Sequence, residues 1–87
     1  MYRVELTRQA QKDLDKLKKS NLSQNAREIV QILKNNPWQN PPPYEKLVGN
    51  LTGKYSRRIN IKHRLVYKVL EEERTVVILS MWSHYDE

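Results

Sequence analysis

The 87-residue chain contains no cysteine, so it can form neither a disulfide framework nor a cysteine-ligated zinc site. Its two histidines show no recognisable metal-ligand spacing. It also lacks a glycine-rich phosphate loop and a serine, histidine and aspartate grouping of the kind that activates a serine nucleophile. Hydrolases of those kinds are excluded, and we expect a protein that uses no metal and no cofactor.

Long apolar runs are also missing. No stretch approaches the roughly 20 residues of a transmembrane helix, and the first residues lack the apolar run of a signal peptide. The absence of cysteine fits a reducing compartment. We therefore expect a cytoplasmic protein that does not associate with membranes.

Positive charge is abundant. Sixteen lysines and arginines against ten acidic residues give a formal charge of +6 and a pI near 9.7, above the value of about 9 that is typical of nucleic-acid-binding domains. Such a field attracts polyanions. Charge alone does not separate RNA, DNA and acidic proteins, and it is also compatible with an ordinary solvated surface.

The first half of the chain predicts a strand followed by a helical hairpin. Residues 2–6 alternate with period two, and Thr7 is placed to cap a helix over residues 8–19 whose apolar positions recur at helical spacing. Ser23 is expected to be the N-cap of a second helix. Prolines follow that helix, so we predict a stiff, extended loop over residues 35–44.

The second half predicts an antiparallel meander. Apolar residues alternate over residues 55–61 and 63–70, and a turn of three glutamates precedes a last strand over residues 75–82. This last strand is apolar on both faces, so we expect it inside the sheet. Residues 1–87 are thus predicted to form one α+β domain: an N-terminal strand, a two-helix hairpin and a meander, giving a four- to five-stranded sheet with helices on one face.

The alternation also separates the arginines of the meander. Arg58 and Arg64 fall opposite the apolar positions, on the uncovered face, where a phosphate-binding pair would have to lie. Two solvated arginines that discourage edge-to-edge pairing explain the pattern equally well. Arg57 falls on the apolar side, and the pattern gives no reason for it.

The two histidines differ in their surroundings. His63 shares the parity of apolar neighbours and lies at a turn, which favours a structural role. His84 follows the last strand beside Tyr85, where it can reach over the sheet, although such a terminal pair is more often incidental. Glutamate, arginine, histidine and tyrosine are the set needed to cleave RNA through its own 2′-hydroxyl, because the substrate then supplies the nucleophile.

Three segments carry a resemblance to a known family: YEKLVGNLTGKYSRRI at residues 44–59, HRLVY at 63–67 and SHY at 83–85. Together they resemble the Txe/YoeB family of bacterial toxins. This family belongs to the RelE/ParE superfamily, in which a toxin enters the ribosomal A site and cuts messenger RNA. The resemblance implies a RelE/microbial-RNase-like fold and a metal-independent endoribonuclease that depends on the ribosome.

The resemblance also gives each site residue a role. Glu45 resembles the general base that takes the proton from the 2′-hydroxyl, and Arg64 resembles the group that stabilises the phosphorane. His84 resembles the general acid that protonates the departing 5′-oxygen, and Tyr85 the residue that positions the nucleotide. Arg58 would be a supporting phosphate contact.

Two departures from the family pattern lie near the C-terminal end. The chain continues past the His-Tyr pair with Asp86 and Glu87, whose carboxylates would favour the protonated histidine and could repel RNA. Met81 and Trp82 stand where the family tends to be more polar or basic. A secondary base contact there is therefore in doubt.

Further RNA contacts are expected from lysines outside the site. These are Lys46 and the first-helix residues Lys12, Lys16, Lys18 and Lys19. Contacts of this kind with the RNA backbone are sequence-blind and salt-dependent. A solvated helix face explains the helix lysines equally well. Leu47 and Leu51 are expected to pack rather than to bind.

Partners follow from the resemblance: the ribosome with its 16S rRNA at the A site, messenger RNA, and an antitoxin of the Phd/YefM type, through which alone DNA would be bound. A homodimer stays open. So do two other classes. A ParE-like gyrase inhibitor that is not a nuclease is opposed by Glu45 and the His84-Tyr85 pair. A plain RNA-binding module would need stacking aromatics on the sheet face, whereas Tyr55 and Tyr67 have core parity.

Overall fold

Residues 1–83, which the computed structural model describes, form two helices and one five-stranded sheet. In chain order the elements are β1 (Arg3–Leu6), α1 (Arg8–Lys19), α2 (Ser23–Asn35), β2 (Glu45–Lys46), β3 (Tyr55–Arg58), β4 (Arg64–Leu70) and β5 (Thr75–Ser83), with single 3-10 turns at Gly49–Leu51 and Glu71–Glu73. None of the helices in this range is long and apolar enough to cross a bilayer.

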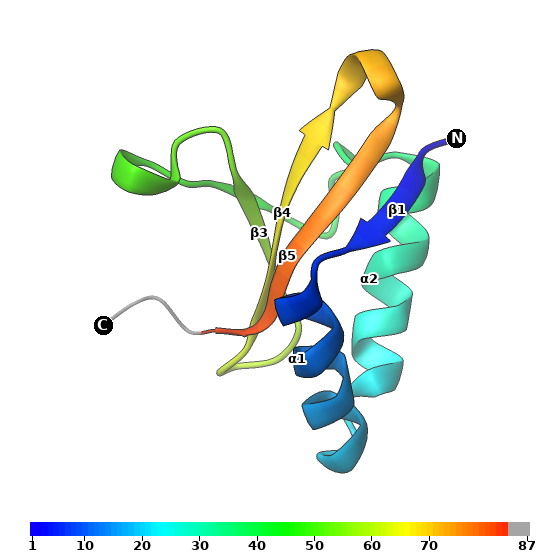
Figure 1. Cartoon of the computed structure of the whole chain (residues 1–87), viewed down its shortest axis with the longest axis vertical. Helices are drawn as coiled ribbons and strands as arrows, with labels where there is room; N and C mark the ends of the chain where they lie inside the picture. The colour runs from blue at the N-terminus through cyan, green and yellow to red at the C-terminus, as the bar shows by residue number, and fades with distance from the viewer. Residues whose placement is uncertain (84–87) are drawn as a thin grey trace.

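The strand order in the sheet is β1-β5-β4-β3-β2. β2 to β5 pair antiparallel, whereas β1 pairs parallel to β5. β5 therefore lies between two strands, as its apolar faces predict. α1 and α2 lie together on one side of the sheet, and the loop near residue 50 projects away from it (Figure 1). The predicted α+β fold is confirmed, with the higher of the two strand counts.

The core fills the space between the helices and the covered face of the sheet. Apolar side chains from both helices, from β4 and β5 and from the β3–β4 turn contribute to it: Ala10, Leu17, Ala26, Ile29, Leu33, Ile59, Leu65, Tyr67, Val76, Ile78 and Met81. Burying one large apolar side chain stabilises a fold by roughly 1.5–3 kcal/mol. The opposite face of the sheet has no helix over it in the described part of the chain.

α1 is bonded to β5 at two points. The Thr7 hydroxyl accepts from the Ala10 N–H at 3.1 Å, as its predicted capping role requires, and also donates to the Leu79 carbonyl at 2.9 Å. Six residues after Thr7, the buried Asp13 carboxylate accepts from the Met81 N–H at 2.9 Å. These bonds hold α1 against the end of β5, where the β4–β5 register shifts.

The start of α2 differs from the prediction. Ser23 is already helical, and Leu22 occupies the N-cap position without a side-chain capping bond, so the predicted Ser23 cap is wrong. The Leu22 N–H donates to the Leu17 carbonyl at 2.9 Å, and its side chain packs against the core. This contact tightens the connection, and the second helix begins one residue early.

β3 is shorter than its alternation predicts. The strand ends at Arg58, because the Asn60 side-chain oxygen accepts from the Lys62 and His63 N–H groups at 2.9 and 2.7 Å and turns the chain. Ile59 is still buried, but Ile61 is 84% exposed at the turn. The expected place of Ile61 on an apolar strand face is therefore wrong.

Residues 36–44 form a loop without regular structure, as predicted, but the loop is not extended. It turns back at once, with the Gln39 N–H donating to the Asn36 carbonyl at 3.0 Å. Several of its carbonyls point inward to the side chain of Arg57. The extended conformation was wrong because a buried cation draws these carbonyls together.

Candidate active site

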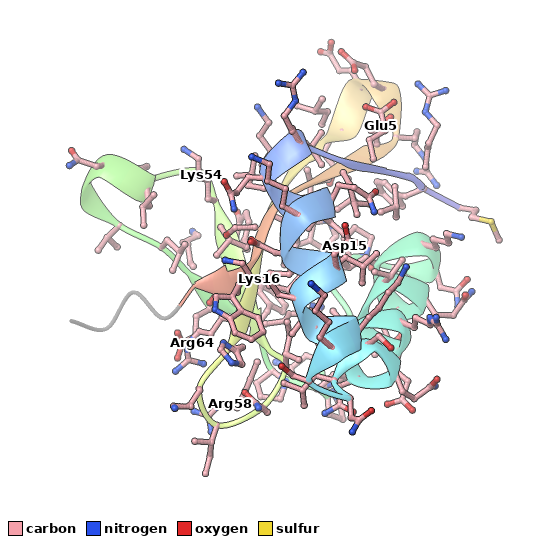
Figure 2. The ribbon with its side chains drawn as sticks, turned by 60° about the horizontal axis from the view of Figure 1, so that its bottom comes forward. Glu5, Asp15, Lys16, Lys54, Arg58 and Arg64 are labelled. Carbon is pink, nitrogen blue, oxygen red and sulfur yellow. The ribbon has the colours of Figure 1, made fainter. Side chains whose placement is uncertain are left out.

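A cavity of about 460 Å³ lies where the β3–β4 turn, the proline loop and α2 approach one another. The charged residues that line it, among those described, are Glu45, Arg57, Arg58 and Arg64. Figure 2 shows Arg58 and Arg64 at the same end of the sheet, beside the β3–β4 turn. Three guanidinium groups against one carboxylate favour an anion such as phosphate.

Strand register explains why three of these residues share one face. Glu45 pairs with Ser56, and Arg58 pairs with Arg64. Side chains directly opposite in an antiparallel pair lie on the same face, and Ser56 and Arg58 are two residues apart. Glu45, Arg58 and Arg64 therefore all lie on the uncovered face, which confirms the placement predicted for the two arginines.

The predicted acid His84 and its neighbour Tyr85 lie outside the described residues, as do Asp86 and Glu87. β5 ends at Ser83, which pairs with Arg64. The described part of the site thus contains the predicted base and the two predicted phosphate contacts.

The lysines lie elsewhere. Lys46 pairs with Tyr55, so its side chain is on the face opposite Glu45. The α1 lysines are exposed, and the Nζ atom of Lys16 lies 5.7 Å from the Trp82 ring centroid. None of these residues lines the cavity. Any contact they make with RNA would be outside it.

His63 is buried, as its parity predicts. Its ring stacks on Trp82 with centroids 4.0 Å apart, and its Nδ1 atom lies 3.2 Å from the Trp82 carbonyl oxygen. Residues 1–83 hold no group of three or more acidic or histidine side chains arranged to bind a metal ion. His63 therefore belongs to the packing of the β5 end.

The sheet tyrosines do not form a stacking platform. Tyr67 is fully buried, and its hydroxyl donates to the Pro37 carbonyl at 3.2 Å. Burial raises the pKa of Tyr67, while the nearby Arg57 charge opposes this. Tyr55 is half-buried and packs edge-on against Trp38 with ring centroids 5.0 Å apart. The alternative of a plain RNA-binding module loses support.

Two leucines of the resembling segment differ in exposure. Leu47 is buried, as expected. Leu51, at the end of the short turn between β2 and β3, is 37% exposed, and its neighbour Val48 is 78% exposed. The expectation that Leu51 packs is therefore wrong.

Arg57 is the residue of this region whose role the sequence did not reveal. It is 2% exposed, it lines the cavity, and it bonds the carbonyls of the proline loop. The available signal was its position, since a cation on the apolar side of a strand must find buried partners. The pattern could not say which partners.

Comparison with known proteins gives a consistent result. The family model described as "YoeB-like toxin of bacterial type II toxin-antitoxin system" matches residues 6–85. A curated relative, Toxin YoeB of Synechocystis, is 36% identical over 75 residues, which cover 86% of this chain and 78% of the relative.

Solved structures agree with this match. A chain of the YoeB-YefM complex from Staphylococcus aureus has a TM-score of 0.81 and 33% identity, over 98% of this chain and 99% of that one. A chain of the archaeal RelE-RelB complex from Pyrococcus horikoshii has a TM-score of 0.77 and 27% identity, over 99% and 98%.

Proposed function

Because the chain belongs to the YoeB-like toxins of bacterial type II toxin–antitoxin systems, we propose that it is a metal-independent endoribonuclease that cleaves messenger RNA in the ribosomal A site. The observation that carries the proposal is the cavity shared by Glu45, Arg58 and Arg64. A carboxylate beside guanidinium groups can supply the base and the charge stabilisation that attack by a 2′-hydroxyl needs.

Glu45 is the proposed general base. Its carboxylate accepts the proton of the 2′-hydroxyl, and the freed oxygen attacks the adjacent phosphorus. The bond from phosphorus to the 5′-oxygen of the next nucleotide then breaks. The products are a 2′,3′-cyclic phosphate, which can open to a 3′-phosphate, and a 5′-hydroxyl. DNA is not a substrate because it lacks the 2′-hydroxyl.

The remaining roles concern charge and the second proton. Arg64 stabilises the additional negative charge of the phosphorane, and Arg58, its cross-strand neighbour, supports it. The family resemblance assigns His84 the donation of a proton to the departing 5′-oxygen and Tyr85 the positioning of the nucleotide. Arginine suits this task because its planar fork matches phosphate oxygens.

The proposed partners are the ribosome, messenger RNA and an antitoxin. Lys46 and the exposed α1 lysines would contact the backbone of ribosomal RNA. Because the ribosome is the proposed partner, the proposed site of activity is the cytoplasm. The similar Staphylococcus aureus chain was solved as a YoeB-YefM complex, and a chain of charge +6 suits an acidic antitoxin segment that orders on binding. DNA would be bound only through that antitoxin, and a homodimer is compatible with the proposal.

The test is to map messenger RNA ends in a purified translation system with the wild-type chain and with Glu45→Gln, Arg64→Ala and His84→Gln. We expect cleavage that needs ribosomes, leaves a 5′-hydroxyl, and falls by about 10²- to 10⁴-fold when the proposed base or acid is replaced. Lys34→Gln is the charge control, because Lys34 is exposed and does not line the cavity.

Three results would contradict the proposal. The first is full cleavage by the Glu45 and His84 variants. The second is a product with a 5′-phosphate. The third is inhibition of gyrase in a supercoiling assay without RNA cleavage, which would support the ParE-like alternative instead.

A further inference from the structure

Arg57 fastens the proline loop to β3. Its Nη1 donates to the Pro42 carbonyl at 2.8 Å, and its Nη2 donates to the carbonyls of Pro37 and Gln39 at 2.9 Å each. Hydrogen bonds from a charged donor are roughly twice as strong as neutral ones. One side chain therefore holds three points of the loop over residues 36–44.

Two aromatic side chains, Trp38 and Tyr44, help to hold the two ends of the same loop. The central carbon of the Arg57 guanidinium lies 5.0 Å from the ring centroid of Tyr44, the residue directly before Glu45. Near the other end, the Trp38 indole N–H donates to the Glu71 carboxylate at 2.9 Å. The chain is thus fixed just before it enters β2.

β2 alone is too short to hold Glu45 firmly. It contains two residues and lies at the edge of the sheet. Very short strand pairs are at best marginally stable in water, and the prolines of the loop have no N–H with which to form a ladder. Leu47 holds the chain after β2, through its N–H bond to the Lys54 carbonyl at 2.9 Å, so the position of the Glu45 backbone also depends on what holds the loop before it.

We propose that Arg57 is a positioning residue, which sets the Glu45 carboxylate at the cavity through the proline loop and Tyr44 and does not itself bind the phosphate. The inference rests on the proposed role of Glu45 as the base. Direct phosphate binding is the competing explanation, because Arg57 also lines the cavity. Its exposure of 2% and its three bonds to backbone carbonyls favour positioning.

The experiment is a double-mutant cycle. Arg57→Lys keeps the charge but loses the fork that reaches three carbonyls. Single-turnover cleavage on programmed ribosomes is measured in the wild-type and in the Glu45→Gln background. We expect Arg57→Lys alone to slow cleavage by about 10- to 100-fold, as a misplaced catalytic group does, with ribosome affinity unchanged. In the Glu45→Gln background it should add no further loss, because both changes act through one carboxylate.

Arg58→Lys is the matched control. Arg58 is the next residue of β3 but is exposed on the uncovered face. As a phosphate contact it should slow cleavage by a similar factor in both backgrounds. If Arg57→Lys behaves like Arg58→Lys, with equal losses with and without the Glu45 carboxylate, Arg57 contacts the phosphate and the inference is wrong.

Loss of folding is separated from loss of position by a second variant. Trp38→Phe removes the indole bond to Glu71 at the other anchor of the loop and keeps an aromatic ring. We expect a smaller loss of cleavage, again absent in the Glu45→Gln background, with faster amide exchange at Glu45 and Lys46. Full activity of both Arg57→Lys and Trp38→Phe, while Glu45→Gln is inactive, overturns this inference alone. Full activity of Glu45→Gln overturns the proposed function itself.

Discussion

Arginine side chains have opposite environments on the two faces of the sheet. Arg57 and Arg58 are adjacent in β3, yet Arg57 is buried on the helix-covered face and Arg58 is exposed on the other. On the covered face both terminal nitrogens of the guanidinium donate to backbone carbonyls. On the uncovered face it stays available to a ligand. The period-two alternation of a strand determines whether an arginine is buried or exposed.

β4 repeats this contrast, and the largest predicted effect comes from it. If Arg64 has its proposed role, we expect Arg64→Ala to reduce messenger RNA cleavage by about 10²- to 10³-fold, and to lower the free energy of unfolding by less than Leu65→Ala does, because Arg64 is only half-buried. Its buried neighbour Leu65 should behave in the reverse way. Leu65→Ala should cost about 2–5 kcal/mol of stability, and the protein that remains folded should cleave normally.

The measurements are urea unfolding and cleavage in the purified translation system for both variants. The comparison of faces breaks down if Arg64→Ala unfolds the chain as much as Leu65→Ala does. It also breaks down if Leu65→Ala, measured well below its unfolding midpoint, loses cleavage to the same extent as Arg64→Ala.

A smaller effect is expected from α1, which lies on the covered side of the sheet. Lys12, Lys16 and Lys19 follow helical spacing and share one side of α1, whereas Lys18 lies elsewhere on its circumference. If that side meets ribosomal RNA, Lys16→Glu should weaken ribosome binding and lower the slope of log affinity against log salt by about 1. Lys34→Glu is the matched control, because Lys34 is exposed on α2 and is not among the proposed RNA contacts.

Ribosome binding is to be titrated over a range of salt concentrations for both lysine variants. Equal affinities and equal slopes for Lys16→Glu and the wild-type chain would reduce this side of α1 to a solvated surface. The uncovered face would then be the chain's principal contact with RNA.

The smallest effect concerns Tyr67 on the covered face. Burial raises its pKa above the ordinary tyrosine value of 10.0, so unfolding releases a hydroxyl that ionises more easily. Its contribution to stability is therefore present below pH 10 and is lost as the pH rises through the higher folded value. Tyr67→Phe should cost about 1 kcal/mol at neutral pH, through the lost bond to Pro37, and should flatten the decline above pH 10.

Urea midpoints of the wild-type chain and Tyr67→Phe from pH 7 to about 11 test this difference. Parallel curves for the two proteins across that range would show that Tyr67 is not the hydroxyl whose burial matters.

The regular periodicity of apolar residues predicted most of the fold. The spacing of apolar residues predicted both helices and the strands of the meander, and the alternation placed Arg58 and Arg64 correctly. It failed at Asn60, where a side chain accepting two N–H groups ended a strand that still alternated. It also gave no sign that β1 pairs parallel to β5, because pairing partners leave no mark in the period of a single strand.

The site was less accessible to such reasoning. β2 has two residues, too few to show any period, so Glu45 could be identified only through the family resemblance. Arg57 stood out as a misplaced cation, but its partners lie 15 to 20 residues earlier in the chain, in a loop without a pattern. Contacts between a strand and an irregular loop depend on the tertiary fold, which local spacing does not encode.

Two hydrogen bonds join the N-terminal half of α1 and its cap to the end of β5. Thr7 and Asp13 grip the backbone at Leu79 and Met81, and two residues later Ser83 is in register with Arg64. A force on α1, such as docking of its lysines would exert, must either break both bonds or shift the end of β5 with it. A partner that displaced α1 would therefore also act on the end of β5, which is in register with Arg64.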